Sequence, residues 1–206
     1  AGDCADCGAD GKTLNPEPGP VGPVSAAPPG KKSPYKLKRR EPLMSNYRRS
    51  YIPGGCWFFT VNLQNRHSDL LTRHIDHLRA AIACAKRKRP FQINSWVVLP
   101  EHMHCIWTLP EGDSDYSGRW REIKKSFTRA LAQNQIWQPR FWEHAIRNDE
   151  DYRCHMDYVY INPVKHRLVG CVRDWPYSTF NRDVRKGLYP EDWAGDTVEI
   201  DAGERR

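Results

Sequence analysis

The sequence predicts an α+β fold, a ferredoxin-like sandwich in which an antiparallel sheet has its helices on one face. Between residues 56 and 162 the apolar pattern alternates between the two-residue repeat of strands and the three-to-four-residue repeat of helices, in the order β-α-β-β-α-β-α. Two of the strand segments are separated by only a few residues, which favours a pair of neighbouring antiparallel strands. This order of elements is typical of α+β sandwiches.

Four segments have the composition of strands. Residues 56–63 are aromatic and β-branched, and a Pro-Gly-Gly turn precedes them. Residues 91–99 and 103–109 flank the short Pro100–Glu101 connection, and residues 140–146 provide the fourth strand.

Two segments have helical spacing before the last strand. Residues 69–88 repeat apolar side chains every three to four positions, and residues 86–89, at the end of this segment and just before Pro90, are all basic. Cations favour a helix C-terminus and Pro stops the helix, so we expect one helix that ends there. Residues 117–133 have an apolar face that includes Trp120, with basic residues on the remaining surface.

The composition divides the chain into three parts. Residues 1–43 hold eight of the 16 Pro, six of the 14 Gly and a single aromatic residue, so we expect a disordered extension that cannot offset the entropy of ordering. Residues 44–190 form the folded domain, and Met44 is a candidate functional start that N-terminal sequencing would test. Residues 191–206 form an acidic tail that either lies over a basic cleft or extends into solvent, and we favour the second.

The charge balance is basic, with 32 Lys and Arg against 25 Asp and Glu. The first 43 residues contribute seven basic and five acidic residues, so the remainder carries most of the net charge of +7. A basic chain fits a polyanionic partner without identifying one. Neither a secretory pattern nor the roughly 20 consecutive apolar residues of a membrane span is present, so we expect a cytoplasmic protein without a membrane partner.

Seven cysteines occur in two settings. Cys4 and Cys7 form a Cys-x-x-Cys pair, but no second pair completes the four ligands of a structural zinc, so we expect two exposed thiols there. The odd total and the missing secretory signal predict reduced, buried thiols for the rest. These are Cys56, Cys84, Cys105, Cys154 and Cys171.

A His-x-His pair is the first candidate site. His102 and His104 are two positions apart on a predicted strand, so both imidazoles point to the same face and can reach one divalent metal. Pro100 places them at the entrance of the strand, near the surface, whereas Met103 and Cys105 would face the core. Alone, this spacing is weak evidence, because eight histidines sometimes fall two apart by chance.

The last helix carries the second candidate group. Asn148 is a good N-cap ahead of three acidic residues, and the helix should end near Asn162 because Pro163 restricts the residue before it. Tyr158 lies one turn before Asn162, on a face displaced from the core stripe, and Asn162 could supply a ligand oxygen. His155 is a neighbour or a substitute ligand. The alternative is a half-buried Tyr and an Asn that caps the helix. The core stripe is Tyr152, Met156 and Val159.

These residues resemble the HUH single-tyrosine transposases (IS200/IS605-like), and most closely the REP-associated tyrosine transposases. The resemblance extends from about Met44 to beyond Trp193. It is carried by MSNYRR, YIPGG, WFFTVNL, WVVLPEHMHCIWTLPEGDSDYS, RWREIKKSF, WQPRFWEHAIRN and DYVYINPVKHRLV. The combination of LPEHMHCIWTLPEG with DYVYINPVKH is the most specific part.

The resemblance implies the HUH transposase fold and assigns the site residues. His102, His104 and Asn162 would bind Mg²⁺ or Mn²⁺, although related insertion-sequence enzymes often have the longer Gln at the position of Asn162. Tyr158 would be the nucleophile, forming a 5′-phosphotyrosine and leaving a free 3′-OH that can rejoin strands.

The resemblance also implies a single-stranded DNA substrate with REP-type hairpins. Arg48 and Arg49 would lie near the guide sequence at the foot of the hairpin. Arg119, Lys124 and Lys125 could hold phosphates, or could simply form the solvated face of their helix.

Three functions fit the sequence. The first is a metal-dependent single-strand endonuclease and strand transferase. The second is a domesticated hairpin-binding protein that no longer cleaves, against which the intact set of His102, His104 and Tyr158 argues. The third is a metal-dependent hydrolase in which the Tyr has no role. The family type favours a monomer, with a dimer as the alternative.

Overall fold

The computed structural model describes residues 51–195, 200, 202 and 203. The expectations for residues 1–43, for Met44 and for Arg48 and Arg49 lie outside these described residues. No helix within the described part of the chain has the length and apolarity to span a bilayer. The elements, in chain order, are β1 (Cys56–Asn62), α1 (Leu70–Arg73), α2 (Ile75–Lys88), β2 (Gln92–Val98), β3 (His102–Thr108), α3 (Tyr116–Ala130), β4 (Trp142–Ala145), α4 (Asp149–Lys165), the 3-10 helix η1 (Val172–Asp174) and α5 (Phe180–Arg185).

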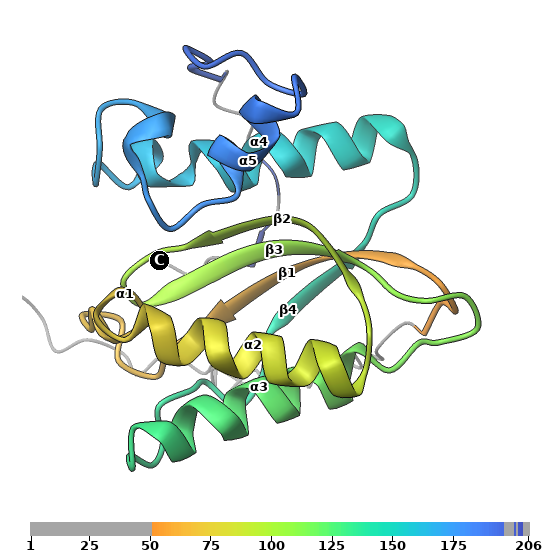
Figure 1. The fold of residues 1–206 in the computed structure, drawn as a ribbon, viewed down its shortest axis with the longest axis vertical. Coiled ribbons are helices and arrows are strands. Elements are labelled where there is room, and N and C mark those ends of the chain that lie inside the picture. The colour runs from red at the N-terminus through yellow and green to blue at the C-terminus, as the bar shows by residue number, and fades with distance from the viewer. Residues whose placement is uncertain (1–50, 196–199, 201, 204–206) are drawn as a thin grey trace, which may run out of the picture. The chain divides into compact units, whose positions relative to one another are not determined.

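The four strands form one antiparallel sheet in the order β2-β3-β1-β4 (Figure 1). β1 and β3 pair from Cys56 opposite Thr108 to Asn62 opposite His102, and they occupy the centre of the sheet. β2 and β4 form the two edges, each antiparallel to its neighbour. The predicted α+β class with a ferredoxin-like order of strands is therefore confirmed.

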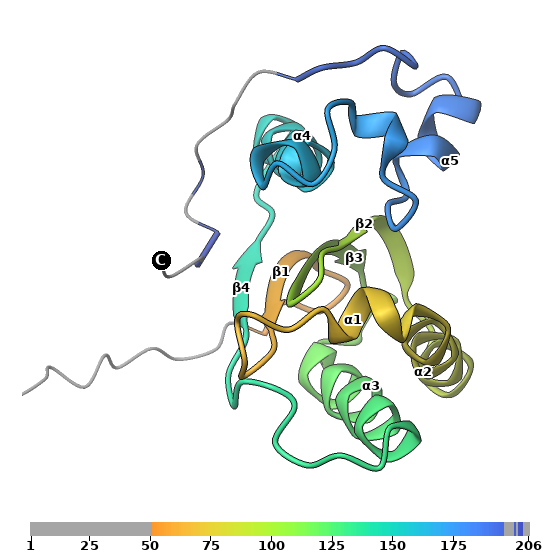
Figure 2. The same cartoon turned by 90° about the vertical axis from the view of Figure 1, so that its left-hand side faces the viewer.

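The helices cover both faces of the sheet. α2 and α3 lie side by side on one face and α4 covers the other, with α5 in the same layer as α4 (Figures 1 and 2). The expectation of helices on one face was therefore wrong. The reason is visible in β1, where Phe58 and Phe59 point to opposite faces and are both 0% exposed. Consecutive buried side chains on a strand require a covering layer on each side.

The layer of α2 and α3 holds an aromatic core. The indole rings of Trp107 and Trp120 stack with centroids 4.3 Å apart, which confirms that Trp120 belongs to the core face of its helix. Met103 and Cys105 face this layer, as expected. The β1 and β3 residues in this core alternate along the chain and are Trp57, Phe59, Val61, Met103, Cys105 and Trp107.

α4 is enclosed on two sides. One side packs on the sheet, and the segment with η1 and α5 packs on another, where the Tyr160 hydroxyl donates to the carboxylate of Asp183. We expected Tyr158 to lie off the core face, and this was wrong, because its side chain is 1% exposed. The helical pattern alone identifies one packed side and does not reveal the second.

Two helix boundaries differ from the expectation. α4 continues through Pro163 to Lys165, with His166 donating to the Asn162 carbonyl at 2.9 Å. Proline removes a single N–H, and the hydrogen bonds of the following turn sustain the helix. The segment 69–88 is interrupted at His74, which separates α1 from α2.

The described part of the acidic tail packs against the sheet. Ala202 is 3% exposed, which contrasts with the solvated terminus that we favoured. Gly203 has a φ of +66° and lies so close to the indole of Trp142 that a Cβ would clash at 2.5 Å. The tail therefore reaches the sheet face covered by α4.

The five described cysteines are free thiols. Of these five, only Cys105 is fully buried, and burial raises the pKa of its thiol well above the ordinary value. Cys171 is exposed, and the remaining three are half-buried.

Candidate active site

Two histidines at the start of β3 point to the sheet face that α4 covers. His102 and His104 lie opposite Asn62 and Thr60 of β1, and their rings have centroids 4.9 Å apart. Both are 0% exposed, so the expectation of a pair near the surface was wrong. They do stand at the strand entrance, and the rings of neighbouring side chains cover them. The closest of these is His166, whose ring centroid is 5.0 Å from that of His102.

Hydrogen bonds fix which ring nitrogen of each histidine carries the proton. The Thr60 hydroxyl donates to the main-chain oxygen of Ala202 at 2.7 Å, so it accepts from Nδ1 of His104 at 2.9 Å. Glu101 accepts from Nδ1 of His102 at 2.9 Å. Each Nε2 is therefore the lone-pair nitrogen that can ligate a metal, with a partner that orients the ring from behind.

Glu101 is held in its ionised form. Burial works to raise the pKa of this carboxyl, but the hydrogen bond from His102 and the nearby Arg66 guanidinium outweigh it and keep the pKa below its ordinary value. A carboxylate behind a histidine raises the basicity of the imidazole as a ligand.

The ring of Tyr158 on α4 faces His104, and Asn162 lies one helical turn further along the same face of α4. The Tyr158 ring lies edge-on to His104 with centroids 5.3 Å apart. Nδ2 of Asn162 donates to the main-chain oxygen of Tyr158 at 2.6 Å, so the amide oxygen points the other way. The alternative of an Asn that caps the helix is excluded, because His166 occupies the C-cap position.

The donor set fits a divalent metal. Oδ1 of Asn162 is buried and has no hydrogen-bond partner in the described structure. Leaving a buried acceptor unsatisfied costs about 1–3 kcal/mol, so such an atom points to a missing ligand. Two imidazole nitrogens and one amide oxygen, with water or phosphate oxygens completing the shell, suit ions such as Mn²⁺ and Mg²⁺.

Lys165 joins the site, and sequence reasoning missed it. Its Nζ donates to the Tyr158 hydroxyl at 3.1 Å and lies 4.5 Å from the centroid of the same ring. The spacing of seven residues, two helical turns, could have placed Lys165 on the face of Tyr158. Because we expected the helix to end near Asn162, Lys165 lay outside the expected helix.

His155 does not belong to this group. The Phe58 ring contacts both His155 and His104, at centroid distances of 4.8 Å and 5.7 Å respectively, and the nearest ring to His155 is that of His144 at 4.6 Å. The role of substitute ligand expected for His155 is therefore not supported by its position.

The basic residues of α3 lie across the sheet from the histidines. Arg119 is 1% exposed, and its guanidinium bonds the Asp113 carboxylate at 2.6 Å and main-chain carbonyls, which argues against the expected phosphate contact. Lys124 is half-buried and donates to the Gln138 carbonyl at 3.1 Å. Lys125 is exposed and, with Lys124 and Arg129, borders an open hollow of about 480 Å³.

A ferredoxin-like sheet that sets a His-x-His strand against a tyrosine on a covering helix defines the class of HUH single-tyrosine transposases. No protein-family model matches the chain. A REP-associated tyrosine transposase of Escherichia coli (strain K12) is 70% identical over 162 residues, which cover 79% of this chain and 98% of that protein. A Haemophilus influenzae relative described by the same family name is 45% identical over 166 residues, covering 74% and 94%.

A solved structure shows the same likeness. The structure of a REP-associated tyrosine transposase bound to a REP hairpin is 69% identical, covers 79% of this chain and 99% of that chain, and superposes with a TM-score of 0.77. The chain belongs to the REP-associated tyrosine transposases.

Proposed function

We propose that this transposase is a metal-dependent endonuclease and strand transferase for single-stranded DNA with REP-type hairpins. The observation that carries the proposal is that His102, His104 and Tyr158 meet in one buried site, with Asn162 one helical turn from Tyr158 and Lys165 at the tyrosine hydroxyl. The hairpin substrate follows from the solved relative, which is bound to a REP hairpin.

A divalent ion held by Nε2 of both histidines and by Oδ1 of Asn162 would polarise the scissile phosphate and fix its orientation. Tyr158 then supplies the nucleophile. Its oxygen forms a bond to phosphorus, the bond from phosphorus to the 3′ oxygen breaks, and the departing strand takes up a proton as a 3′-OH. The 5′-phosphotyrosine keeps a reactive ester, so a 3′-OH can attack it and rejoin strands without ATP.

Lys165 prepares the tyrosine for this step. Its ammonium donates to the Tyr158 oxygen in the ground state, and the same contact strengthens as negative charge develops on that oxygen. The Tyr158 side chain is 1% exposed, so substrate binding must uncover its hydroxyl before attack.

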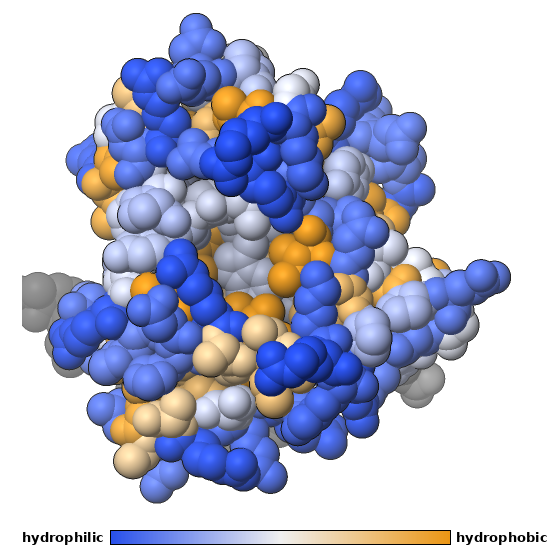
Figure 3. All heavy atoms as spheres, in the orientation of Figure 1, coloured by the Kyte–Doolittle hydropathy of each residue, from blue (hydrophilic) through white to orange (hydrophobic). Residues whose placement is uncertain are grey.

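DNA binding would use basic side chains on two parts of the chain. We assign Arg48 and Arg49 to the DNA next to the hairpin foot, and Lys125 to phosphates further along the strand. Hydrophilic residues cover most of the face in Figure 3, with apolar residues gathered in its middle band. In the Arg48→Ala/Arg49→Ala variant, two phosphate contacts are lost. The slope of log K for DNA binding against log salt concentration should therefore become shallower by about two.

The decisive experiment is incubation of the protein with a labelled hairpin single strand and Mn²⁺ or Mg²⁺. We expect a denaturant-stable protein–DNA adduct that is absent in Tyr158→Phe. Cleavage that survives in Tyr158→Phe would overturn the nucleophile and favour a hydrolase, whereas binding without cleavage would favour the domesticated hairpin-binding protein. Gel filtration beside the cleavage assay tests the monomeric state that we propose, in which one chain suffices because Tyr158 and His104 face each other within it.

A further inference from the structure

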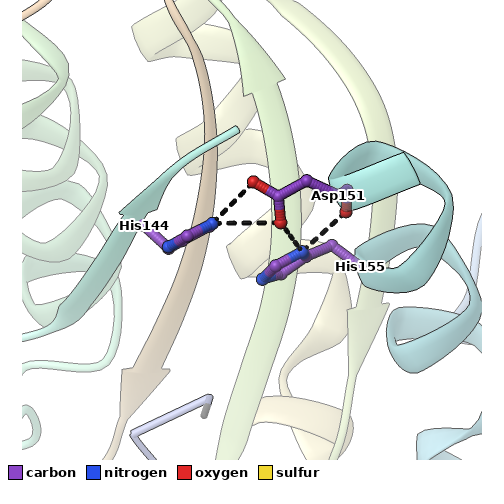
Figure 4. A group of neighbouring side chains, drawn as sticks. All are labelled: His144, Asp151 and His155. Atoms are coloured by element: carbon purple, nitrogen blue, oxygen red, sulfur yellow. Dashed lines mark hydrogen bonds and ion pairs between the residues drawn. The ribbon is translucent and has the colours of Figure 1, made fainter. Parts of the chain in front are cut away.

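A second group of metal-binding side chains lies on the same sheet face, beyond Phe58. It consists of His144 from β4 and of Asp151 and His155 from the first turns of α4 (Figure 4). The proposed function does not use any of the three.

The imidazole rings of His144 and His155 both approach the carboxylate of Asp151. Nε2 of His144 lies 3.1 and 2.9 Å from the two carboxylate oxygens of Asp151, and Nδ1 of His155 lies 2.9 Å from Oδ1. The imidazole rings stack in parallel, with centroids 4.6 Å apart and an angle of 10° between their planes. All three ligand atoms lie within 4.8 Å of one another. Metal–ligand bonds of about 2.0–2.2 Å could therefore reach a single ion after small side-chain rotations.

The helix spacing and the strand pairing determine which way these three side chains point. Asp151 and His155 are four residues apart on α4, so they share a face of the helix. His144 is opposite Phe58 in the pairing of β1 with β4, which fixes its side of the sheet. Neither His102 nor His104 belongs to this group of ligand atoms, so the two groups would hold separate ions.

The protonation states suit metal binding. Burial lowers the pKa of His155, which leaves its ring neutral at pH 7. Burial works to raise the pKa of Asp151, but hydrogen bonds from His144 and from the Arg147 main chain outweigh it and keep the carboxyl ionised. In the metal-free form Nδ1 of His155 donates to the Asp151 main-chain oxygen at 2.8 Å. Ligation would shift that proton to the other ring nitrogen or to solvent.

We propose that His144, Asp151 and His155 form a second divalent-metal site for a borderline transition ion such as Zn²⁺, separate from the site of His102 and His104. Two imidazoles and a carboxylate are a donor set that zinc prefers, with water in the remaining position. The side chains of His144 and Asp151 are 24% and 18% exposed, which gives an ion access from solvent. A bound ion would tie β4 to the helix that carries Tyr158.

The test is zinc stoichiometry by equilibrium dialysis and elemental analysis, in the full chain with Cys4→Ser and Cys7→Ser to remove thiol ligands. We expect two zinc ions in this background, one in Asp151→Asn, one in the His102→Ala/His104→Ala variant and none in the combination. Asp151→Asn is nearly isosteric, and His144→Gln provides a second variant if the first does not fold. His77→Ala is the matched control, because the His74 and His77 rings also stack but at 6.0 Å, and it should leave the stoichiometry unchanged.

A second readout is the melting temperature with and without zinc. The rise on zinc addition should persist in the His102→Ala/His104→Ala variant and disappear in Asp151→Asn and His144→Gln. The proposal is overturned if Asp151→Asn and His144→Gln bind as much zinc as the background, or if the His102→Ala/His104→Ala variant binds none. A single ion that is lost in Asp151→Asn alone would support this site and contradict the other one.

Discussion

The hydroxyl of Thr60 lies between His104 and the C-terminal tail, accepting from Nδ1 of the histidine at 2.9 Å and donating to the Ala202 carbonyl at 2.7 Å. Because one hydroxyl has one proton, its donation to the carbonyl decides that His104 carries its own proton on Nδ1. The tail thereby contributes to the chemical state of a histidine 98 positions earlier in the chain.

Thr60→Val should weaken metal binding at the active site. Valine has the shape of threonine but cannot accept the proton of His104, so the imidazole is free to adopt the tautomer that blocks Nε2. Loss of such an orienting partner typically costs about 10- to 100-fold in metal affinity. Calorimetric titration with Mn²⁺ measures this, and Thr60→Ser, which keeps the hydroxyl, should bind like the parent. Equal affinity of the valine variant would contradict the role of Thr60.

Asn162→Ala should lower Mn²⁺ affinity at least about 100-fold, because in the proposed site it removes a ligand rather than a supporting partner. Hairpin affinity without metal should change little. Asn181→Ala is the matched control, since the Asn181 amide donates to a main-chain carbonyl at 3.0 Å far from the histidines. If the alanine variant binds Mn²⁺ normally, the unsatisfied Oδ1 of Asn162 has another explanation.

Lys165→Met should slow single-turnover cleavage by about 10²- to 10³-fold, the usual cost of removing one donor at a developing negative charge. Methionine keeps most of the side-chain volume, so hairpin affinity should be nearly unchanged. Lys165→Arg should retain part of the rate, and Lys186→Met, at an exposed position after α5, should retain all of it. A Lys165→Met variant that cleaves at the normal rate would show that the contact with Tyr158 is only structural.

Much of the site was predictable because the strand repeat is strict. A spacing of two puts His102 and His104 on one face and Met103 on the other, whatever packs against the sheet. The helix repeat is equally regular, and it correctly placed Asn162 one turn after Tyr158.

The remaining features depend on tertiary packing that local patterns do not encode. The burial of Tyr158 follows from its packing on Phe58 and His104 of the sheet, which no periodicity within α4 can indicate. The sequence predicts that the helix ends before Pro163, but α4 continues to Lys165. The missing N–H of proline removes one hydrogen bond, and the neighbouring turn keeps the helix intact. Arg119 resembles a surface cation in sequence, and its contacts with Asp113 and with main-chain carbonyls explain its burial.

The ion pair between Arg119 and Asp113 predicts a pH dependence of stability. The hydrogen bond from Arg119 keeps the pKa of Asp113 below its ordinary value. A lowered folded-state pKa means that this pair stabilises the fold above about pH 4, the unfolded pKa, and that the contribution is lost as pH falls through the folded-state pKa. Asp113→Asn should therefore lower the unfolding free energy by about 1–3 kcal/mol at pH 7, because Arg119 is left buried with a weaker partner.

Urea unfolding at pH 7, 4 and 3 measures the difference between Asp113→Asn and the parent, which should shrink as the pH falls. Asp76→Asn is the control, because the Asp76 side chain is 91% exposed in its pair with Arg79 and should matter little at any of these pH values. In the same Asp113→Asn protein, the salt dependence of hairpin binding should match the parent, since Arg119 serves the fold. A reduced salt dependence would instead indicate that Arg119 contacts DNA.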